Sequence, residues 1–434
     1  MADRLFKRHI VWVLLIMALL LAGCAQKKES VLVGSSSFSE ASALESMESI
    51  EKRVSELRGL ETLQPVVKAF LTTDELRQRM TEDVLENYSE QEAQDDVLLY
   101  RAFEFIDPDI DLRSLFIDLQ TEQVLGFYDA DTQEMYVVKR SEEPTAFDRW
   151  TFSHEYTHVL QDQHFDLQAL GFTDEDEDED EDSEAQFAIR SLVEGDASLL
   201  MQQYAIQYFE MEDLQEILTQ SEALDSSVLD SAPEVVRESL MFPYDAGLIF
   251  VMALFEEGGW SAVDAAYADP PVSTEQILHP ERYPDDAPQV ITLPPLTDTL
   301  GSGWRLVDED VLGEFGLRQY LDVYLNSSDV EAAAEGWGGD RYAVYWRDDE
   351  SAFVLALHLA WDTPSDAQEF FEAYARFAES RFGSGPTRTE GDDHLWWLGD
   401  DALLLAHDGQ VETLILIAPD ENALEALEAR FPGS

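Results

Sequence analysis

The sequence of 434 residues predicts an α+β protein in which a mainly helical domain is followed by a smaller α+β domain. Apolar residues recur at helical spacing on both sides of a strand-like stretch at residues 123–140, and strand-like alternation returns beyond residue 300. A hydrophobic content of 45% and an aromatic content of 11% are typical of a folded chain with a sizeable core. We expect the two domains at residues 44–290 and 300–434.

The first 23 residues have the features of a secretory signal peptide. A basic segment precedes the apolar run IVWVLLIMALLLAG at residues 10–23, which is short for a membrane-spanning helix. The run ends in Leu21-Ala22-Gly23-Cys24, which resembles a bacterial lipobox. The resemblance implies cleavage before Cys24 and lipidation of this cysteine, so that a lipid anchors the protein outside a membrane, at the cell surface or in the periplasm. A polar, Ser-rich tether is predicted at residues 24–43.

The composition excludes several classes of function. Cys24 is the only cysteine, so the globular part has no intrachain disulfide and no thiolate nucleophile. The chain has 27 basic and 91 acidic residues, a net charge of −64. Such a charge repels nucleic acid and anionic head groups, so we expect no nucleic-acid partner. A saline habitat, where salt screens the self-repulsion, and an ordinary acidic secreted protein are both compatible with this charge.

From about residue 44 to residue 120, apolar residues recur at helical spacing and predict helices. Apolar residues three or four positions apart form two stripes, one made of Met47, Ile50, Val54 and Leu57 and the other of Leu76, Met80, Val84 and Leu85. No motif with recognisable chemistry falls in this region.

A β-hairpin and then a capped helix are predicted next. The stretch QVLGFYDADTQEMYVVKR at residues 123–140 contains two β-rich runs around a four-residue connection at residues 129–132. Thr145 and Asp148 have the spacing of a capping box, directly after Pro144, and predict the start of a helix.

This helix carries the motif H-E-x-x-H, formed by His154, Glu155 and His158. Two imidazoles four residues apart lie on one helix face and can bind one tetrahedral Zn²⁺. Glu155 lies beside such a metal without ligating it, where it can act as general base toward a zinc-activated water and then protonate a leaving amine. The two histidines could also be structural.

His164 is one candidate for the third ligand that a catalytic zinc needs. It occupies the position of the third histidine in H-E-x-x-H-x-x-G-x-x-H, the metzincin motif, which this stretch resembles in part. Gln161 stands at the position of the glycine that breaks the metzincin helix, and on an unbroken helix His164 points away from the other two histidines.

Glu194 in RSLVEGDASLL is the other candidate, on the next predicted helix. Its order after H-E-x-x-H resembles the gluzincins, the thermolysin-like clan of zinc metallopeptidases. The resemblance covers roughly residues 120–260 and implies that Glu194 completes the zinc site and that the hairpin binds extended peptide by edge pairing. Ser198 stands where that clan places an Asp that supports the first histidine. An ion pair of Glu194 with Arg190, an exposed charge, and the weaker ligand Asp196 remain as alternatives.

The rest of the chain carries no further chemical motif. The acidic run at residues 173–185 predicts a solvated loop, for which cation binding stays open. Helices are expected near 212–222 and 233–257. The C-terminal domain is expected to contain a hairpin, an amphipathic helix, three more strands and a final helix, and its role is not apparent.

The sequence therefore predicts a lipid-anchored zinc metallopeptidase with a peptide or protein substrate. The predicted ligands are His154, His158 and Glu194, with Glu155 as general base. Tyr204, Tyr244 and His279 are unranked candidates for stabilising the oxyanion of the tetrahedral intermediate. From a different class, a surface lipoprotein that keeps the zincin scaffold as a binding module is the alternative, and a metzincin-like site with His164 is the alternative among enzymes.

Overall fold

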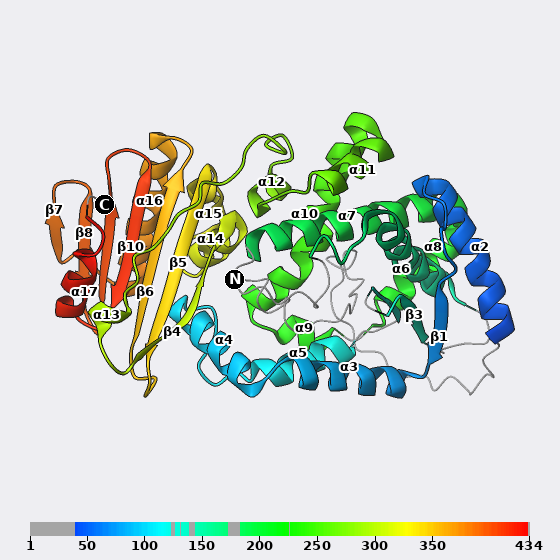
Figure 1. Ribbon diagram of the computed structural model, residues 1–434, viewed down its shortest axis with the longest axis horizontal. Helices are drawn as coiled ribbons and strands as arrows, with labels where there is room; N and C mark the ends of the chain where they lie inside the picture. Colours follow the sequence, from blue (N-terminus) through cyan, green and yellow to red (C-terminus); the bar gives the residue numbers. More distant parts are fainter. Residues whose placement is uncertain are drawn as a thin grey trace.

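The computed structural model describes residues 40–122, 126–130, 132–138, 144–171, 183–224 and 226–432. It is an α+β protein with two sheets (Figure 1). The predicted signal peptide, Cys24, most of the tether and nearly all of the acidic run lie outside the described residues. The helix α2 (Glu40–Arg58) already occupies the last four positions of the predicted tether, so the tether prediction was wrong there.

The smaller sheet has three strands in the order β1-β3-β2. The predicted hairpin is present as β2 (Gly126–Asp129) and β3 (Glu134–Val138), and its connection begins one residue later than expected. β1 (Val67–Leu71) pairs in parallel with β3 and was not expected from the sequence, which predicted helices from about residue 44 to residue 120. Leu85 is 47% exposed and does not belong to its predicted apolar stripe.

Helices make up the remainder of the predicted first domain. The capping box of α6 (Ala146–Phe165) is confirmed, because Thr145 accepts from the Asp148 amide and Asp148 accepts from the Thr145 amide. α7 begins at Ser183, so the helix starts inside the segment predicted as acidic loop. The other helices before residue 290 are α3 (Thr73–Asn87), α4 (Glu90–Ala102), α5 (Leu112–Glu122), α8 (Met211–Ser221), α9 (Ser227–Ser231), α10 (Glu234–Gly258), α11 (Trp260–Ala268) and α12 (Thr274–Leu278).

The C-terminal part is built on a seven-stranded antiparallel sheet of order β4-β5-β6-β10-β9-β8-β7. Alternate residues of its strands face opposite sides, and α16 packs on one face while α17 packs on the other. The predicted hairpin, long helix, three strands and final helix are confirmed. These elements are β4 (Trp304–Asp310), β5 (Trp337–Arg347), β6 (Phe353–Trp361), β7 (Arg388–Glu390), β8 (His394–Leu398), β9 (Ala402–His407), β10 (Glu412–Ala418), α13 (Thr297–Leu300), α14 (Gly313–Asp322), α15 (Ser327–Ala334), α16 (Pro364–Phe382) and α17 (Glu421–Glu428).

One hydrophobic core joins the two predicted domains. It contains side chains of α4, α5 and α9 together with the face of the large sheet that α16 covers. In Figure 1, α4 lies directly beside β4. The indole of Trp346 in β5 donates a hydrogen bond of 3.0 Å to the carbonyl of Leu98 in α4. The large sheet is therefore packed onto the helical part rather than tethered to it.

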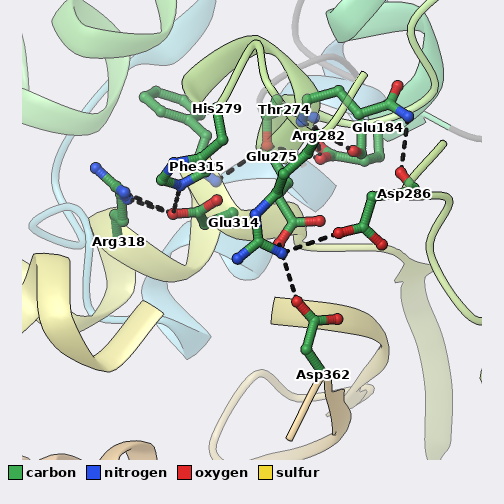
Figure 2. Close-up of polar contacts among 12 residues, drawn as sticks. Glu184, Thr274, Glu275, His279, Arg282, Asp286, Glu314, Phe315, Arg318 and Asp362 are labelled. Carbon is green, nitrogen blue, oxygen red and sulfur yellow. Dashed lines mark hydrogen bonds and ion pairs between the residues drawn. The ribbon is translucent and has the colours of Figure 1, made fainter. Parts of the chain in front are cut away.

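A polar junction at α12 adds to this contact (Figure 2). Glu184, at the start of α7, accepts hydrogen bonds from the amide and hydroxyl of Thr274, and the Thr274 hydroxyl accepts one from the Phe315 amide. Nearby, Arg282 forms ion pairs with three carboxylates, those of Glu275, Asp286 and Asp362. These three carboxylates are close enough to hold a metal ion, but they already pair with the partly buried guanidinium of Arg282. We assign the cluster to joining the two parts of the chain.

α7 and α10 approach each other at two glycines. An added Cβ on Gly195 would lie 2.1 Å from the Gly247 carbonyl oxygen, and one on Gly247 would lie 2.1 Å from the Ser191 carbonyl oxygen. α10 is also, among the described residues, the one helix long and apolar enough to cross a membrane by length and composition. The face of α10 that carries Gly247 packs against α7, the helix that carries Glu194.

We expect Gly195→Ala to destabilise the protein by about 2 kcal/mol or more, because the two backbones must separate to admit a methyl group. Alanine gains only about 1 kcal/mol of helix propensity over glycine, which does not compensate. The midpoint of thermal unfolding measures the effect. Gly385→Ala is the matched control, since its Cβ would meet only a side-chain oxygen at 3.6 Å. Equal midpoints for the two variants would contradict the close helix contact.

Candidate metal centre

α6 presents the motif histidines to the interior. His154 and His158 are 1% and 0% exposed, and the indole of Trp150, one turn earlier, donates to the Met201 carbonyl of α7. α6 and α7 therefore pack with the motif between them, which brings Glu194 to the histidines from 40 residues away.

His154, His158 and Glu194 form a compact triangle of ligand atoms. The Nε2 atoms of the two histidines are 3.2 Å apart, and Glu194 Oε2 lies 3.2 Å from His154 Nε2 and 3.5 Å from His158 Nε2. Neighbouring ligands of a tetrahedral metal with bonds of about 2.0–2.1 Å are about 3.3 Å apart. The three side chains thus fit one face of a zinc tetrahedron, which leaves a fourth position for another group.

The charges in the triangle also suit a cation. Burial opposes ionisation of Glu194, but the two facing histidines outweigh it and lower the pKa of the carboxyl to about 2. Burial lowers the pKa of His154, whereas the carboxylate of Glu194 raises the pKa of His158 against the effect of burial. A buried carboxylate is costly unless it is paired or bound to a metal. Glu194 faces the two histidines, and these three side chains could together hold a metal ion.

Glu155 lies beside the triangle and faces the small sheet. Its Oε2 accepts a hydrogen bond of 3.2 Å from the Tyr128 amide of β2, and its Oε1 has no partner among the described residues. Burial raises the pKa of Glu155 to about 8. The Tyr128 amide points away from β3, so the outer edge of β2 faces Glu155. The unpaired Oε1 of Glu155 can therefore accept a proton at a position beside the edge strand β2.

A hydrogen-bonded chain behind His158 was not expected from the sequence. Gln161 accepts a bond of 2.7 Å from His158 Nδ1 and donates one of 3.0 Å to Asp196. Asp196 in turn accepts two bonds from the buried Arg58 and one from the Tyr267 hydroxyl. With Nδ1 protonated, His158 turns its Nε2 lone pair toward the triangle. The spacing from His158 to Gln161, three residues on one helix, was the available sign of this contact.

We expect Gln161→Leu to lower the affinity for zinc by about 10- to 100-fold, the usual effect of removing the group that orients a metal-binding histidine. Competition with a fluorescent zinc chelator measures the affinity. The absorption spectrum of the Co²⁺-substituted protein reports the ligand geometry, which a purely structural role would leave unchanged. Gln207→Leu, at an exposed position of α7, serves as the matched control. Unchanged affinity and spectrum in Gln161→Leu would refute the positioning role.

The other residues singled out in the sequence lie elsewhere, with one exception. His164 is on the same unbroken helix, and its Nε2 lies 2.8 Å from the Glu61 carbonyl oxygen. His154 Nδ1 has no partner among the described residues, in line with Ser198 at the position of the supporting Asp.

The exception is Tyr244 of α10. Its ring stacks at 6.2 Å on His154, and burial together with the charge of Glu194 raises its pKa far above the ordinary value.

Tyr204 and His279, the other two candidates for oxyanion stabilisation, are engaged away from the triangle. The Tyr204 hydroxyl accepts from Arg53, and its ring packs on Tyr208 and Phe209. His279 pairs with Glu314 at the junction of Figure 2. Of the three candidates, only Tyr244 therefore contacts the triangle, through the ring of His154.

Comparison with known proteins concerns the C-terminal part alone. Residues 303–428 match a family described as a domain of unknown function, DUF8575. The match extends from just before β4 to the end of α17 and includes none of the metal-centre residues. No curated protein and no solved structure matches the chain.

Proposed function

We propose that this protein is a zinc-dependent metallopeptidase of gluzincin type. The observation that carries the proposal is the buried triangle of His154, His158 and Glu194, whose ligand atoms are 3.2–3.5 Å apart, with Glu155 adjacent. Three protein ligands with a fourth position left for another group are the pattern of catalytic zinc, whereas structural zinc usually has four protein ligands. We further propose a lipid anchor at Cys24, which would hold the enzyme at the outer side of a membrane.

Each protein group then has a defined task. Zinc bound by the triangle would supply Lewis acidity, which acidifies water and polarises a carbonyl. Glu155 takes the proton of the attacking water and passes it to the leaving amine. Tyr244, beside His154, donates its hydroxyl proton toward the oxyanion of the tetrahedral intermediate. The outer edge of β2, which faces Glu155, would align an extended peptide by main-chain pairing.

Metal removal tests the proposal directly. The purified full-length chain in detergent is expected to cleave a mixed peptide library, to lose this activity after dialysis against a chelator, and to regain it with one equivalent of Zn²⁺. The cleavage products are identified by mass spectrometry. Zinc binding without any metal-dependent cleavage would favour the binding-module alternative. Cleavage that a chelator leaves untouched would refute the proposal.

A further inference from the structure

The reacting groups of the metal centre are closed off from solvent. The side chains of His154, His158, Glu155 and Glu194 are each at most 3% exposed. The Oε1 atom of Glu155, which would take the proton of the attacking water, is itself buried. A peptide is much larger than a water molecule, so a peptide can reach this atom only if an element of the protein moves.

A pocket that ends beside Glu155 indicates which element can move. With its mouth the pocket encloses about 630 Å³ of empty space. Its walls come from α6, from the small sheet and from the first half of α2, where Ala43, Met47 and Ile50 line it. α6 carries the two histidines, and β3 is held by a strand on either side. In Figure 1, α2 lies at the right-hand edge of the molecule, outside α6, so it is the wall that can move without disturbing the metal centre.

The two halves of α2 are held differently. Val54 in the second half is fully buried. Arg58, the last residue of α2, forms ion pairs of 2.8 Å with Asp196 and 2.7 Å with Asp264. The first half lies over the pocket, so part of the space beneath it is empty and offers no atoms for dispersion contacts. Segments with fewer packed contacts open locally at a lower free energy, which makes the first half the end that opens.

We propose that the first three turns of α2, residues 40–50, form a lid over the pocket that ends beside Glu155. The lid unwinds from its N-terminal end to admit the substrate, and the rest of α2 stays in place. Helix ends unwind readily because their terminal backbone groups lack intrahelical partners. The need for an opening rests on the proposed function, whereas the opening itself belongs to the fold and can be measured without zinc.

Cysteine labelling measures the opening. Cys24 is the only natural cysteine, so the full-length Cys24→Ser chain in detergent is a background without thiols. Thr151→Cys places a thiol in the pocket, at a position that is 5% exposed. Ser239→Cys places one at a fully buried position of α10 outside the pocket and serves as the control for global unfolding. Mass spectrometry follows the rate at which each thiol reacts with biotin maleimide.

Two glycine substitutions in α2 form a matched pair. Glu48 lies in the lid and Glu56 in the anchored half, and both are exposed and do not line the pocket. The low helix propensity of glycine corresponds to about a fivefold change in an unwinding equilibrium. Glu48→Gly is therefore expected to accelerate the labelling of Thr151→Cys about fivefold, and Glu56→Gly by less than about twofold, because Arg58 holds that half. The kcat/KM for a cleaved peptide should rise in the same proportions, at unchanged zinc content.

The thiol at position 151 is expected to react at least about tenfold faster than the thiol at position 239, because local opening is more frequent than global unfolding. Equal rates at the two positions, or the same acceleration by both glycine substitutions, would overturn the lid. If Glu48→Gly accelerates labelling but no peptide is cleaved, the lid stands and the peptidase proposal fails. If peptides are cleaved and Glu48→Gly changes neither labelling nor kcat/KM, the peptidase stands and the lid fails.

Hydrogen exchange of the wild-type chain replaces the labelling should a cysteine variant not fold. The amides of residues 44–50 are then expected to exchange at least about tenfold faster than those of residues 51–58. Equal exchange in the two halves of α2 would overturn the lid.

Discussion

Replacement of Glu155 by glutamine is expected to lower peptide turnover by about 10²- to 10⁴-fold, the contribution of a positioned general base. An amide is close in size to the carboxyl and still accepts the Tyr128 amide hydrogen, but it cannot take a proton from water. The zinc content should not change, because Glu155 is not a ligand of the triangle. Turnover of a peptide from the library and zinc per chain by atomic absorption provide the two measurements.

Glu257→Gln, at an exposed position of α10, is the matched control for the loss of one carboxylate. It should retain wild-type turnover and zinc. If Glu155→Gln keeps more than a tenth of wild-type turnover, another group accepts the proton. If Glu155→Gln loses zinc together with activity, Glu155 is needed to maintain the metal site, and the prediction that it acts only as a base is wrong.

Replacement of Glu194 by alanine is expected to weaken zinc binding by about a hundredfold. Four-ligand zinc sites bind with about 10–16 kcal/mol, or roughly 3 kcal/mol for each ligand, and about 1.4 kcal/mol corresponds to a factor of ten. Glu194 supplies the only carboxylate of the triangle, so its loss also removes the charge that balances the cation. Zinc affinity by chelator competition and zinc content after gel filtration measure the effect.

His164→Ala distinguishes the two arrangements of ligands. His164 contacts the Glu61 carbonyl at the far end of α6, so its loss should leave zinc affinity within about twofold of wild type, as expected for a residue outside the site. Zinc retained by Glu194→Ala and lost by His164→Ala would reverse the assignment and support a metzincin-like site.

Local patterns in the sequence predicted the elements around the centre. The capping box at Thr145 and the spacing of His154 and His158 depend only on residues within a turn or two, so the helix and its shared face follow from sequence. The role of Glu194 as a candidate ligand could be predicted from the sequence, because an acidic residue among small and apolar residues of a helix is unusual. β1 could not be predicted from the sequence. Its segment VKAFL is only five residues long and takes the strand conformation because it pairs with β3, which lies more than sixty positions later.

The role of Gln161 depends on contacts that no local pattern contains. The sequence marks this position only as lacking the glycine of a metzincin. Its actual partners are Asp196, on another helix, and through it Arg58, 138 residues away from Asp196 along the chain. Such a chain exists only after α2, α6 and α7 have packed, and each link is polar and buried. A search for buried polar side chains three residues after a metal-binding histidine would have pointed to Gln161, but not to what holds it.

The core shared by α4 and the large sheet bears on whether residues 303–428, the segment that matches DUF8575, can fold alone. In this chain Trp346 rests on α4 through its bond to Leu98, and Arg101 of α4 covers its ring at 4.8 Å. Arg381 of α16 reaches Glu104, just beyond α4. A fragment cut at residue 303 would leave these groups behind and expose the sheet face that α4 covers. The segment therefore depends here on a helical surface some two hundred residues upstream, and without that surface one face of the sheet would be exposed.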